Sequence, residues 1–512
     1  MTTRIVCFFF AVSLSLLISV CDAREISLRI LYFNDFHGFA EPYKPLGSEE
    51  KVGGITYFAA KLNKLRREKP SVFLAAGDMI QGDNWANLFQ GRSVIELLNV
   101  MRLDAMVLGN HEFDFGQAVL RRRLREARFP VLGANVQGLK GIKPYVIKKV
   151  QGVRVAIVGI ATPDTAVSTH PRNVAGLKFL SPEDTVKKYL PSLKRRADLV
   201  ILLTHLGYPV DRALAEKAPG ADVIVGGHTH TKLVKPTVIG RTVIVQAWEH
   251  AKALGVLDLE LKDGKVVKAE GRLEEIKPVA GQEDPKTLHI VKKYQSRVDA
   301  ILNVKIGVAL VDLDADQVRV RETRLGNLVA DIIRQRAGAQ AAIINGGGIR
   351  TSINQGDIIR KQVYAALPFD NYIVAIRLTG RQIRDTLEHG VSGLEELAGR
   401  FPQVSGLTFT YDPTAPPGSR VREVTVGGQP LEPEREYTVA TNDFLAAGGD
   451  GFTAFGEAIR ADRTFEVAGG MLKSARLVFS DAGTWIRDVV IDYISARKQV
   501  GAELEGRIKA VK

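Results

Sequence analysis

Five short polar clusters in the first half of the chain combine histidine with carboxylate or amide side chains. They are Asp35-Phe36-His37, Gly77-Asp78, Gly109-Asn110-His111-Glu112, Thr204-His205 and Gly226-Gly227-His228-Thr229-His230. Carboxylate oxygens and imidazole nitrogens are suitable ligands for hard to borderline divalent ions. The glycines beside them allow the backbone to approach a ligand closely. These residue types predict a site for divalent metal ions.

The distribution of the histidines favours one shared site over scattered structural roles. Five of the nine histidines in the chain lie in these clusters. Two ions about 3.5–4 Å apart need a bridging carboxylate and ligands on both sides, and Asp78 is the natural bridge. The other four lack such neighbours, and we assign them structural roles: His170, His250, His289 and His389.

Each cluster follows a short apolar run that is too short for a helix. The runs are ISLRILYF (26–33), VFLAA (72–76), AMVL (105–108), LVILL (199–203) and DVIV (222–225). Such runs are typical of strands buried on both faces. Helical patterns lie between them, for example over Tyr57–Glu68 and Ser93–Met101. We therefore expect layered α/β packing, with the polar clusters gathered in loops at one edge of a sheet.

The length of the chain predicts two domains, because a single core stops growing at roughly 250–300 residues. Residues 270–284 are polar and include Pro278 and Gly281, and Pro285 follows them. A helical pattern follows over Lys286–Leu302, with apolar Leu288, Val291, Val298 and Ile301. We expect a first domain over 24–275, a linker and bridging helix over 276–305, and a second α/β domain over 306–512.

The first 23 residues have the pattern of an export signal. Arg4 precedes an apolar stretch over 5–20, and Ala23 offers a small residue for cleavage. Cys7 and Cys21 are the only cysteines. Cleavage after Ala23 would leave no thiol for disulfides, catalysis or metal binding. We expect a periplasmic or secreted protein with no transmembrane segment; lipid attachment at Cys21 is less favoured, because Val20 is a poor small-residue position.

The net charge of +13 is spread along the chain. Its densest basic run, Arg121–Arg123, lies in a helical pattern between Leu120 and Leu124 and is typical of a solvated helix face. We therefore expect no nucleic-acid partner, although a basic balance helps to attract anionic substrates.

The second half of the chain carries side chains suited to a nucleotide. Arginines pair with phosphate oxygens. Phenylalanines stack on a flat base, although a single phenylalanine is more often part of a core. Asparagine and aspartate accept hydrogen bonds from ribose hydroxyls. The residues with these properties are Arg319, Arg350, Phe369, Asn371, Phe444 and Asp450.

The motifs DFHG, GDMIQGD, GNHEFD, THLG and GGHTH resemble the five-block signature of the calcineurin-like metallophosphoesterases. Together with RVRE, GNL, NGGGIR, LPFDN and NDFLAAGGDGF, they make the chain similar to the 5′-nucleotidase family over about residues 26–506. The resemblance implies a four-layer α/β/β/α metallophosphoesterase sandwich. It also implies a helical linker to a C-terminal α/β substrate-binding domain, with a hinge at the connection.

The resemblance also assigns roles to individual residues. One ion would be held by Asp35, His37, Asp78 and His230, and the other by Asp78, Asn110, His205 and His228. His111 and Asp114 would be the catalytic pair. Arg319, Asn345 and Arg350 would bind the phosphate and nearby groups, Phe369 and Phe444 would flank the base, and Asn371 and Asp450 would meet the ribose. Some family members carry an amide residue at the position of His230.

We therefore expect hydrolysis of nucleoside 5′-monophosphates to nucleoside and phosphate by metal-activated water, in nucleotide catabolism. The cofactors would be two divalent ions (Zn, Mn, Co, Mg or Fe), and the protein a monomer or homodimer. A UDP-sugar hydrolase and a 2′,3′-cyclic-nucleotide phosphodiesterase remain open, because each presents a base and a ribose. A non-catalytic exported nucleotide-binding protein predicts missing metal ligands, and the five clusters are complete.

Overall fold

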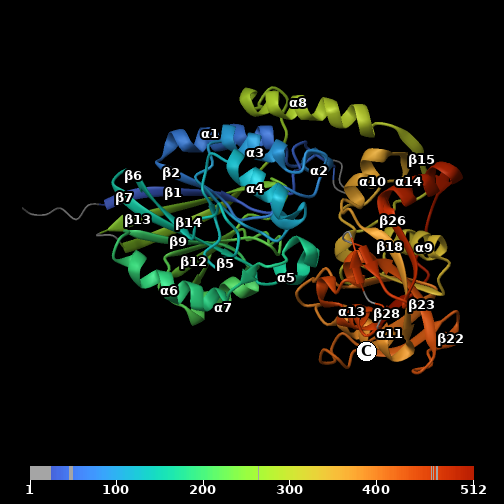
Figure 1. Cartoon of the computed structure of the whole chain (residues 1–512). Helices are drawn as coiled ribbons and strands as arrows, with labels where there is room; N and C mark the ends of the chain where they lie inside the picture. Colours follow the sequence, from blue (N-terminus) through green and yellow to red (C-terminus); the bar gives the residue numbers. More distant parts are fainter. Residues whose placement is uncertain are drawn as a thin grey trace, which may run out of the picture.

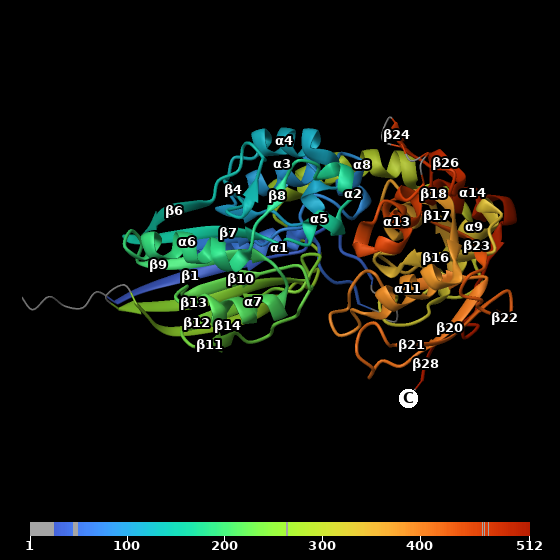
Figure 2. The ribbon, with the colours of Figure 1, turned by 60° about the horizontal axis from the view of Figure 1, so that its bottom comes forward.

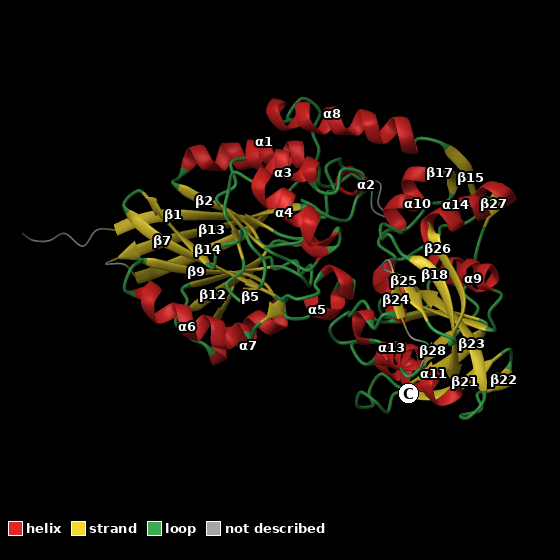
Figure 3. Ribbon diagram, in the orientation of Figure 1, coloured by secondary structure: helices red, strands yellow, loops and turns green. Residues whose placement is uncertain are grey.

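The computed structural model describes residues 25–44, 50–262, 265–462, 464, 466–468 and 471–511. The expected export signal, with Cys7 and Cys21, lies outside the described residues. The described chain forms two lobes that lie side by side (Figures 1 and 3). Within it, no helix is both long and apolar enough to cross a membrane.

The N-terminal lobe contains two six-stranded sheets. The first has the order β14 (Lys265–Glu275), β13 (Ala253–Lys262), β1 (Glu25–Phe33), β2 (Ser71–Ala75), β3 (Ala105–Val107) and β4 (Val131–Leu132). The second has the order β11 (Thr237–Ile239), β12 (Thr242–Gln246), β10 (Val223–Gly226), β9 (Leu199–His205), β7 (Val153–Ala161) and β6 (Tyr145–Val150). Strands β1 to β4 are parallel, as are β7, β9, β10 and β12.

Alternation along β1 shows how the layers are built. Leu28 and Ile30 point into the core between the two sheets, whereas Leu31 and Phe33 join a core under the helices. The helices of that outer layer are α1 (Ile55–Glu68), α3 (Arg92–Val100) and α4 (Gly116–Glu126). On the far side, α6 (Pro182–Lys194) and α7 (Tyr208–Lys217) cover the second sheet. The order of layers is the predicted α/β/β/α sandwich, because each sheet buries both faces.

Helix α8 (Pro285–Leu302) connects the lobes and leads into the second one (Figure 1). The Asp284 side chain caps it by accepting a hydrogen bond from the Thr287 N–H at 2.9 Å. Val291 and Val298 are buried in the core of the N-terminal lobe, so the helix is part of that lobe's packing. The predicted apolar face is partly wrong: Ile301 is 52% exposed. The polar stretch predicted from residue 270 also begins inside a strand, because β14 continues to Glu275.

The C-terminal lobe is a mixed α/β structure around a five-stranded sheet. Its order is β19 (Pro402–Ser405), β16 (Ala341–Asn345), β23 (Glu436–Asn442), β18 (Tyr372–Thr379) and β26 (Leu477–Trp485). One core lies under α9 (Arg324–Ala337) and α14 (Ile486–Arg497), and another under α11 (Gly380–Val391) and α13 (Thr453–Arg460). Two of the smaller sheets also belong to this lobe. One has the order β17 (Gly356–Ile359), β15 (Lys305–Ala309) and β27 (Gln499–Val500). The other has the order β22 (Gln429–Pro430), β21 (Val421–Val426), β20 (Leu407–Tyr411) and β28 (Ile508–Ala510).

Short elements of the N-terminal lobe lie next to the second lobe. They are α2 (Asn84–Asn87) and α5 (Thr165–Ser168), both at the edge that faces the C-terminal lobe (Figure 2). The Asn84 side chain donates a hydrogen bond to the Lys361 carbonyl at 2.8 Å across this boundary. The loops after the parallel strands end at the same boundary, which places the predicted ligands there.

Candidate metal centre and substrate site

The predicted metal ligands follow the carboxyl ends of five parallel strands. Asp35 and His37 follow β1, Asp78 follows β2 and Asn110 follows β3, whereas His205 ends β9 and two histidines follow β10. The two sheets end at one edge, so the ligands of both meet there. Two groups of side chains each place their ligand atoms within 4.8 Å of one another: Asp35, His37, His230, and Asp78, His205, His228.

Asp78 lies between these two groups. Its Oδ2 atom is 3.1 Å from His205 Nε2 and 3.9 Å from His37 Nε2, which belong to different groups. The same oxygen lies 3.9 Å from His111 Nε2. This position between the two groups is the one required of a carboxylate that bridges two metal ions.

Hydrogen bonds at Nδ1 turn the Nε2 atoms of three histidines toward the centre. The Nδ1 atoms of His37 and His205 face the carbonyls of Gln81 at 2.8 Å and Ala76 at 2.7 Å, and His230 Nδ1 faces the Glu249 carboxylate. A carbonyl or carboxylate requires a proton on Nδ1, so the neutral ring has its lone pair on Nε2. Several other buried polar atoms of the centre have no hydrogen-bond partner among the residues that the structure describes: Asp35 Oδ1, Asn110 Oδ1 and His228 Nδ1. The donors therefore fit divalent cations.

Burial and charge oppose each other at this centre. Burial acts to raise the pKa of Asp78, but the charges of His205 and His111 outweigh it and hold that pKa well below its usual range. Burial, together with the charge of His205, lowers the pKa of His228 to about 3. Metal binding requires ionised carboxylates and neutral imidazoles. Asp78 and His228 are already in that state, whereas Asp78 raises the pKa of His205 to about 10, so a metal ion would displace the proton of His205.

The backbone around the ligands adopts an unusual conformation. Positive φ angles occur at five of the seven predicted ligands: Asp35 (48°), His37 (49°), Asp78 (56°), His228 (84°) and His230 (52°). Non-glycine residues rarely adopt this region, and such strain concentrates at functional sites. Glycine neighbours are also required sterically, since a Cβ atom on Gly109 would lie 2.2 Å from Asp78 Oδ1.

The predicted catalytic pair is formed at the N-terminus of α4. His111 Nδ1 lies 2.6 Å from Asp114 Oδ2, three residues along a short 3₁₀ turn. This hydrogen bond fixes the tautomer of His111 and leaves Nε2 facing the centre. Burial acts to lower the pKa of His111, but the charges of Asp78 and Asp114 raise it above its usual value.

Three residues at the centre were not among the predicted site residues, and one of them, His250, was assigned a structural role. Glu112 is buried and accepts hydrogen bonds from the backbone N–H groups of Gly109, Asp78, Met79 and Ile80, so it anchors the loop that carries Asp78. Glu249 and His250 form a third group with His230. Glu112 could have been found from its place in the GNHEFD motif, whereas Glu249 and His250 are marked only by following β12.

The C-terminal lobe brings positive charge and an aromatic ring to the same place. Arg350 Nη2 lies 3.4 Å from His37 Nε2, and the Phe369 ring stacks on the His111 ring at 5.8 Å between centroids. Burial and the charge of Arg350 lower the pKa of Arg319 to about 10. An arginine whose charge is destabilised by burial and by a second arginine favours an anion beside it.

The remaining predicted substrate residues lie deeper in that lobe. Asn345 Nδ2 donates to Asp450 Oδ2 at 2.7 Å, so these two meet directly. Asn345, Phe369 and Asn371 line one small cavity. Phe444, in contrast, is only 9% exposed and belongs to a core, packed so closely that a Cβ atom on Gly449 would lie 2.3 Å from its ring.

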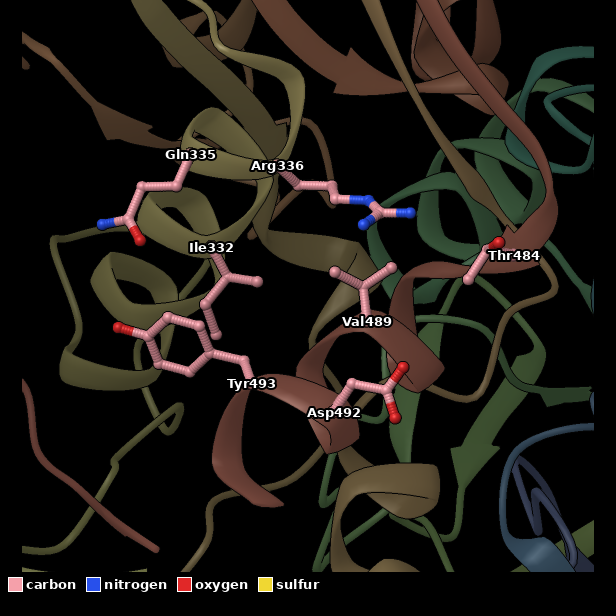
Figure 4. Close-up of a pocket in the computed structure, with 7 residues that line it drawn as sticks. All are labelled: Ile332, Gln335, Arg336, Thr484, Val489, Asp492 and Tyr493. Carbon is pink, nitrogen blue, oxygen red and sulfur yellow. The ribbon is translucent and has the colours of Figure 1, made fainter. Parts of the chain in front are cut away.

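A separate cavity of about 230 Å³ lies on the C-terminal lobe between α9 and α14 (Figure 4). Ile332 and Val489 form its apolar part, and Arg336 and Asp492 lie at its polar side. It contains none of the predicted site residues, and size alone does not make it the reactive site.

Two family patterns match the chain. Calcineurin-like phosphoesterase matches residues 28–232, and 5′-nucleotidase, C-terminal domain, matches residues 305–457. A bovine 5′-nucleotidase is 31% identical over 551 residues, covering 95% of this chain and 91% of its own. This chain belongs to the 5′-nucleotidase family. The resemblance inferred from the motifs is thereby confirmed, and the chain is a metal-dependent phosphoester hydrolase.

Two further relatives show the extent of the similarity. A crystal structure of a 5′-nucleotidase precursor from Thermus thermophilus superimposes with a TM-score of 0.85 at 35% identity, covering 95% of this chain and 100% of that one. The trifunctional nucleotide phosphoesterase YfkN of Bacillus subtilis is 34% identical over 454 residues, which is 78% of this chain. This chain spans only 31% of the length of YfkN.

Proposed function

We propose that this protein hydrolyses nucleoside 5′-monophosphates to nucleoside and phosphate with two divalent ions. The observation that carries the proposal is the approach of Arg350, from the C-terminal lobe, to His37, from the candidate metal centre. A phosphoryl group bound at this point would contact both the arginine of the C-terminal lobe and the metal centre of the N-terminal lobe. The names of the bovine and Thermus relatives support the same substrate class.

The residues at the centre would have distinct roles in metal binding, proton transfer and phosphate binding. Asp35, His37, Asp78 and His230 would hold one ion, and Asp78, Asn110, His205 and His228 the other. When bound, such ions neutralise phosphoryl charge and make water nucleophilic near neutral pH. His111, held by Asp114, would donate a hydrogen bond from Nε2 to a phosphoryl oxygen or protonate the departing oxygen. Arg319 and Arg350 would bind the phosphate.

The base and ribose would be held by the C-terminal lobe. We propose Phe369 and Phe444 as the base-stacking residues, Asn371 and Asp450 as ribose partners, and Asn345 as a partner of Asp450 and the substrate. We also propose the domain division at 275/276 and 305/306, and export directed by residues 1–23.

A substrate panel tests the function. Purified protein is assayed with AMP, UDP-glucose and 2′,3′-cyclic AMP, each with Mn, Zn, Mg and Co ions and after removal of metal by a chelator. We expect AMP to give the highest kcat/KM and chelation to abolish it. Preference for UDP-glucose or the cyclic nucleotide would replace the proposed substrate, and activity that survives chelation would exclude the metal mechanism.

A further inference from the structure

One short segment of the N-terminal lobe contacts both the catalytic pair and the C-terminal lobe. It follows α5 and contains Thr169 and His170, two adjacent residues. The Thr169 hydroxyl donates a hydrogen bond to Asp114 Oδ1 at 2.7 Å. His170 Nε2 lies 3.5 Å from Asp443 Oδ2 in the C-terminal lobe. Neither residue belongs to the site predicted from the sequence.

The contact of Thr169 completes the environment of Asp114. One carboxylate oxygen of Asp114 binds His111 Nδ1, and the other accepts the Thr169 hydroxyl. Asn173 Nδ2, in the same segment, donates to the Asp114 backbone carbonyl at 2.8 Å. Thr169 is 1% exposed, so water does not compete for this bond. The carboxylate plane, and with it the direction of the His111 ring, is therefore fixed by the segment.

The contact of His170 is directed across the lobe boundary. The Arg172 backbone N–H donates to His170 Nδ1 at 3.3 Å, so the neutral ring carries its proton on Nε2, the atom that faces Asp443. Asp443 is 1% exposed; its Oδ1 accepts from the Tyr372 N–H at 3.0 Å, and its Oδ2 has no hydrogen-bond partner within the described part of the chain. A buried carboxylate oxygen without a partner is costly, which makes His170 its natural donor.

Asp443 lies next to the residues that we propose bind the nucleotide. Asp443 begins α12 (Asp443–Ala446) and directly precedes Phe444, the proposed base-stacking residue. Helix α5, which leads into the segment, also contacts the turn at Gly449–Gly451, which carries Asp450. The segment therefore touches the part of the C-terminal lobe assigned to base and ribose.

We propose that Thr169 is a positioning residue for Asp114, and that His170 couples this position to the seating of the C-terminal lobe through Asp443. Contact between the lobes would then order the segment and align His111 at the same time. The coupling to nucleotide rests on the proposed function, whereas the positioning of Asp114 applies to any phosphoester that the centre hydrolyses.

The positioning role is tested with Thr169→Val, Thr169→Ser and a matched control, Thr165→Val. Thr165 is a fully buried threonine of α5, four residues before Thr169, and its hydroxyl donates to the Thr162 carbonyl, away from the site. We expect Thr169→Val to lower kcat roughly tenfold or more on AMP and on p-nitrophenyl phosphate, with little change in KM. Thr169→Ser should restore it. Equal losses in Thr165→Val, or no rescue by serine, would overturn the role.

The coupling role is tested with His170→Ala, His170→Gln and the control His289→Ala, an exposed histidine on α8. We expect His170→Ala to raise KM for AMP about tenfold, as for loss of one hydrogen bond to a charged group, and to leave KM for p-nitrophenyl phosphate unchanged. Glutamine, which retains a donor, should restore most of the affinity. A rise on both substrates would show a general defect and refute coupling to the nucleotide-bearing lobe.

A distance measurement separates the two proposals if AMP proves to be a poor substrate. Spin labels are placed at Val167→Cys and Glu457→Cys, two exposed positions on α5 and α13, in protein produced from residue 24 and therefore free of native cysteine. Metal-free protein is measured with and without AMP. We expect His170→Ala to shift the label distances to longer values and His289→Ala to leave them unchanged. Unchanged distances in His170→Ala would refute the contact, whatever the substrate.

Discussion

The Nε2 atoms of His37 and His230 face each other at 3.3 Å, although their residues follow strands of two different sheets. Both rings use Nδ1 for a hydrogen bond to an acceptor, so Nε2 is the atom that each neutral ring would offer to a metal ion. Two Nε2 atoms at this distance need a proton or a metal ion between them, because two lone pairs would repel each other. Asp35 and Glu249 raise the pKa of His230 to about 9, so a metal ion would displace that proton. This contact places one histidine from each sheet at the same ion, so binding of that ion depends on the orientation of the His230 ring.

Glu249 should control the affinity of that ion. Its carboxylate binds His230 Nδ1 and also accepts from Lys252 Nζ at 2.5 Å. We expect Glu249→Ala to weaken binding of the first ion roughly 10- to 100-fold, because the ring loses the partner that orients it. Isothermal titration with Mn and Zn measures this directly. Glu275→Ala, which removes an exposed carboxylate paired with Lys232, is the control; similar affinities in both variants would contradict the assignment.

Asp78→Asn should abolish turnover far more than nucleotide binding. The amide cannot supply the second anionic oxygen that a bridge between two cations needs. We expect kcat on AMP to fall by roughly 10²–10³-fold or more, while the affinity of the metal-free protein for AMP, measured by titration, changes little. Asp198→Asn, at a surface ion pair with Arg154, serves as the control. Hydrolysis near the wild-type rate would show that Asp78 is not the bridge.

Phe444 should contribute to nucleotide affinity through its ring. Because the side chain is packed in a core, leucine is a better replacement than alanine, since it retains volume. Loss of base stacking of about 1–3 kcal/mol should raise KM for AMP and leave p-nitrophenyl phosphate nearly unaffected. Phe455→Leu, at a fully buried ring of the same core, controls for packing. If KM rises equally for both substrates, or equally in Phe444→Leu and Phe455→Leu, the Phe444 ring contributes to packing alone.

Asp450 should make the stability of the C-terminal lobe depend on pH. Burial raises its pKa to about 6, partly offset by the hydrogen bond from Asn345. A raised folded-state pKa means that stability is fully present below the ordinary aspartate range, near pH 4, and is lost as pH rises through 6. Asp450→Asn removes this loss. We expect it to raise the free energy of unfolding, relative to wild type, by about 1–2 kcal/mol more at pH 8 than at pH 4. Urea denaturation of metal-free protein at both values measures the difference, and a pH-independent effect would contradict it.

Local sequence was sufficient for the strands and for the clusters that follow them. The apolar run before Asp78 predicts β2, and its fully buried residues show why no polar residue interrupts it. The helix after Pro285 was also predicted, but its buried face was predicted only in part: Val291 and Val298 are buried, whereas Ile301 points to solvent. The spacing of apolar residues along a helix does not by itself determine which of them are buried when the helix lies over two lobes.

The sequence by itself determined the kind of chemistry, because metal-ligand types and their glycine neighbours are local properties that sit in contiguous motifs around His37, Asp78 and His228. Only the tertiary structure decided which side chains support them. Glu249 reaches His230 across 19 residues, and Thr169 reaches Asp114 across 55. Such partners come from separate strands and loops, and their common location is set by the order of strands in the sheets. That order depends on packing between distant segments, which no local pattern of residues records.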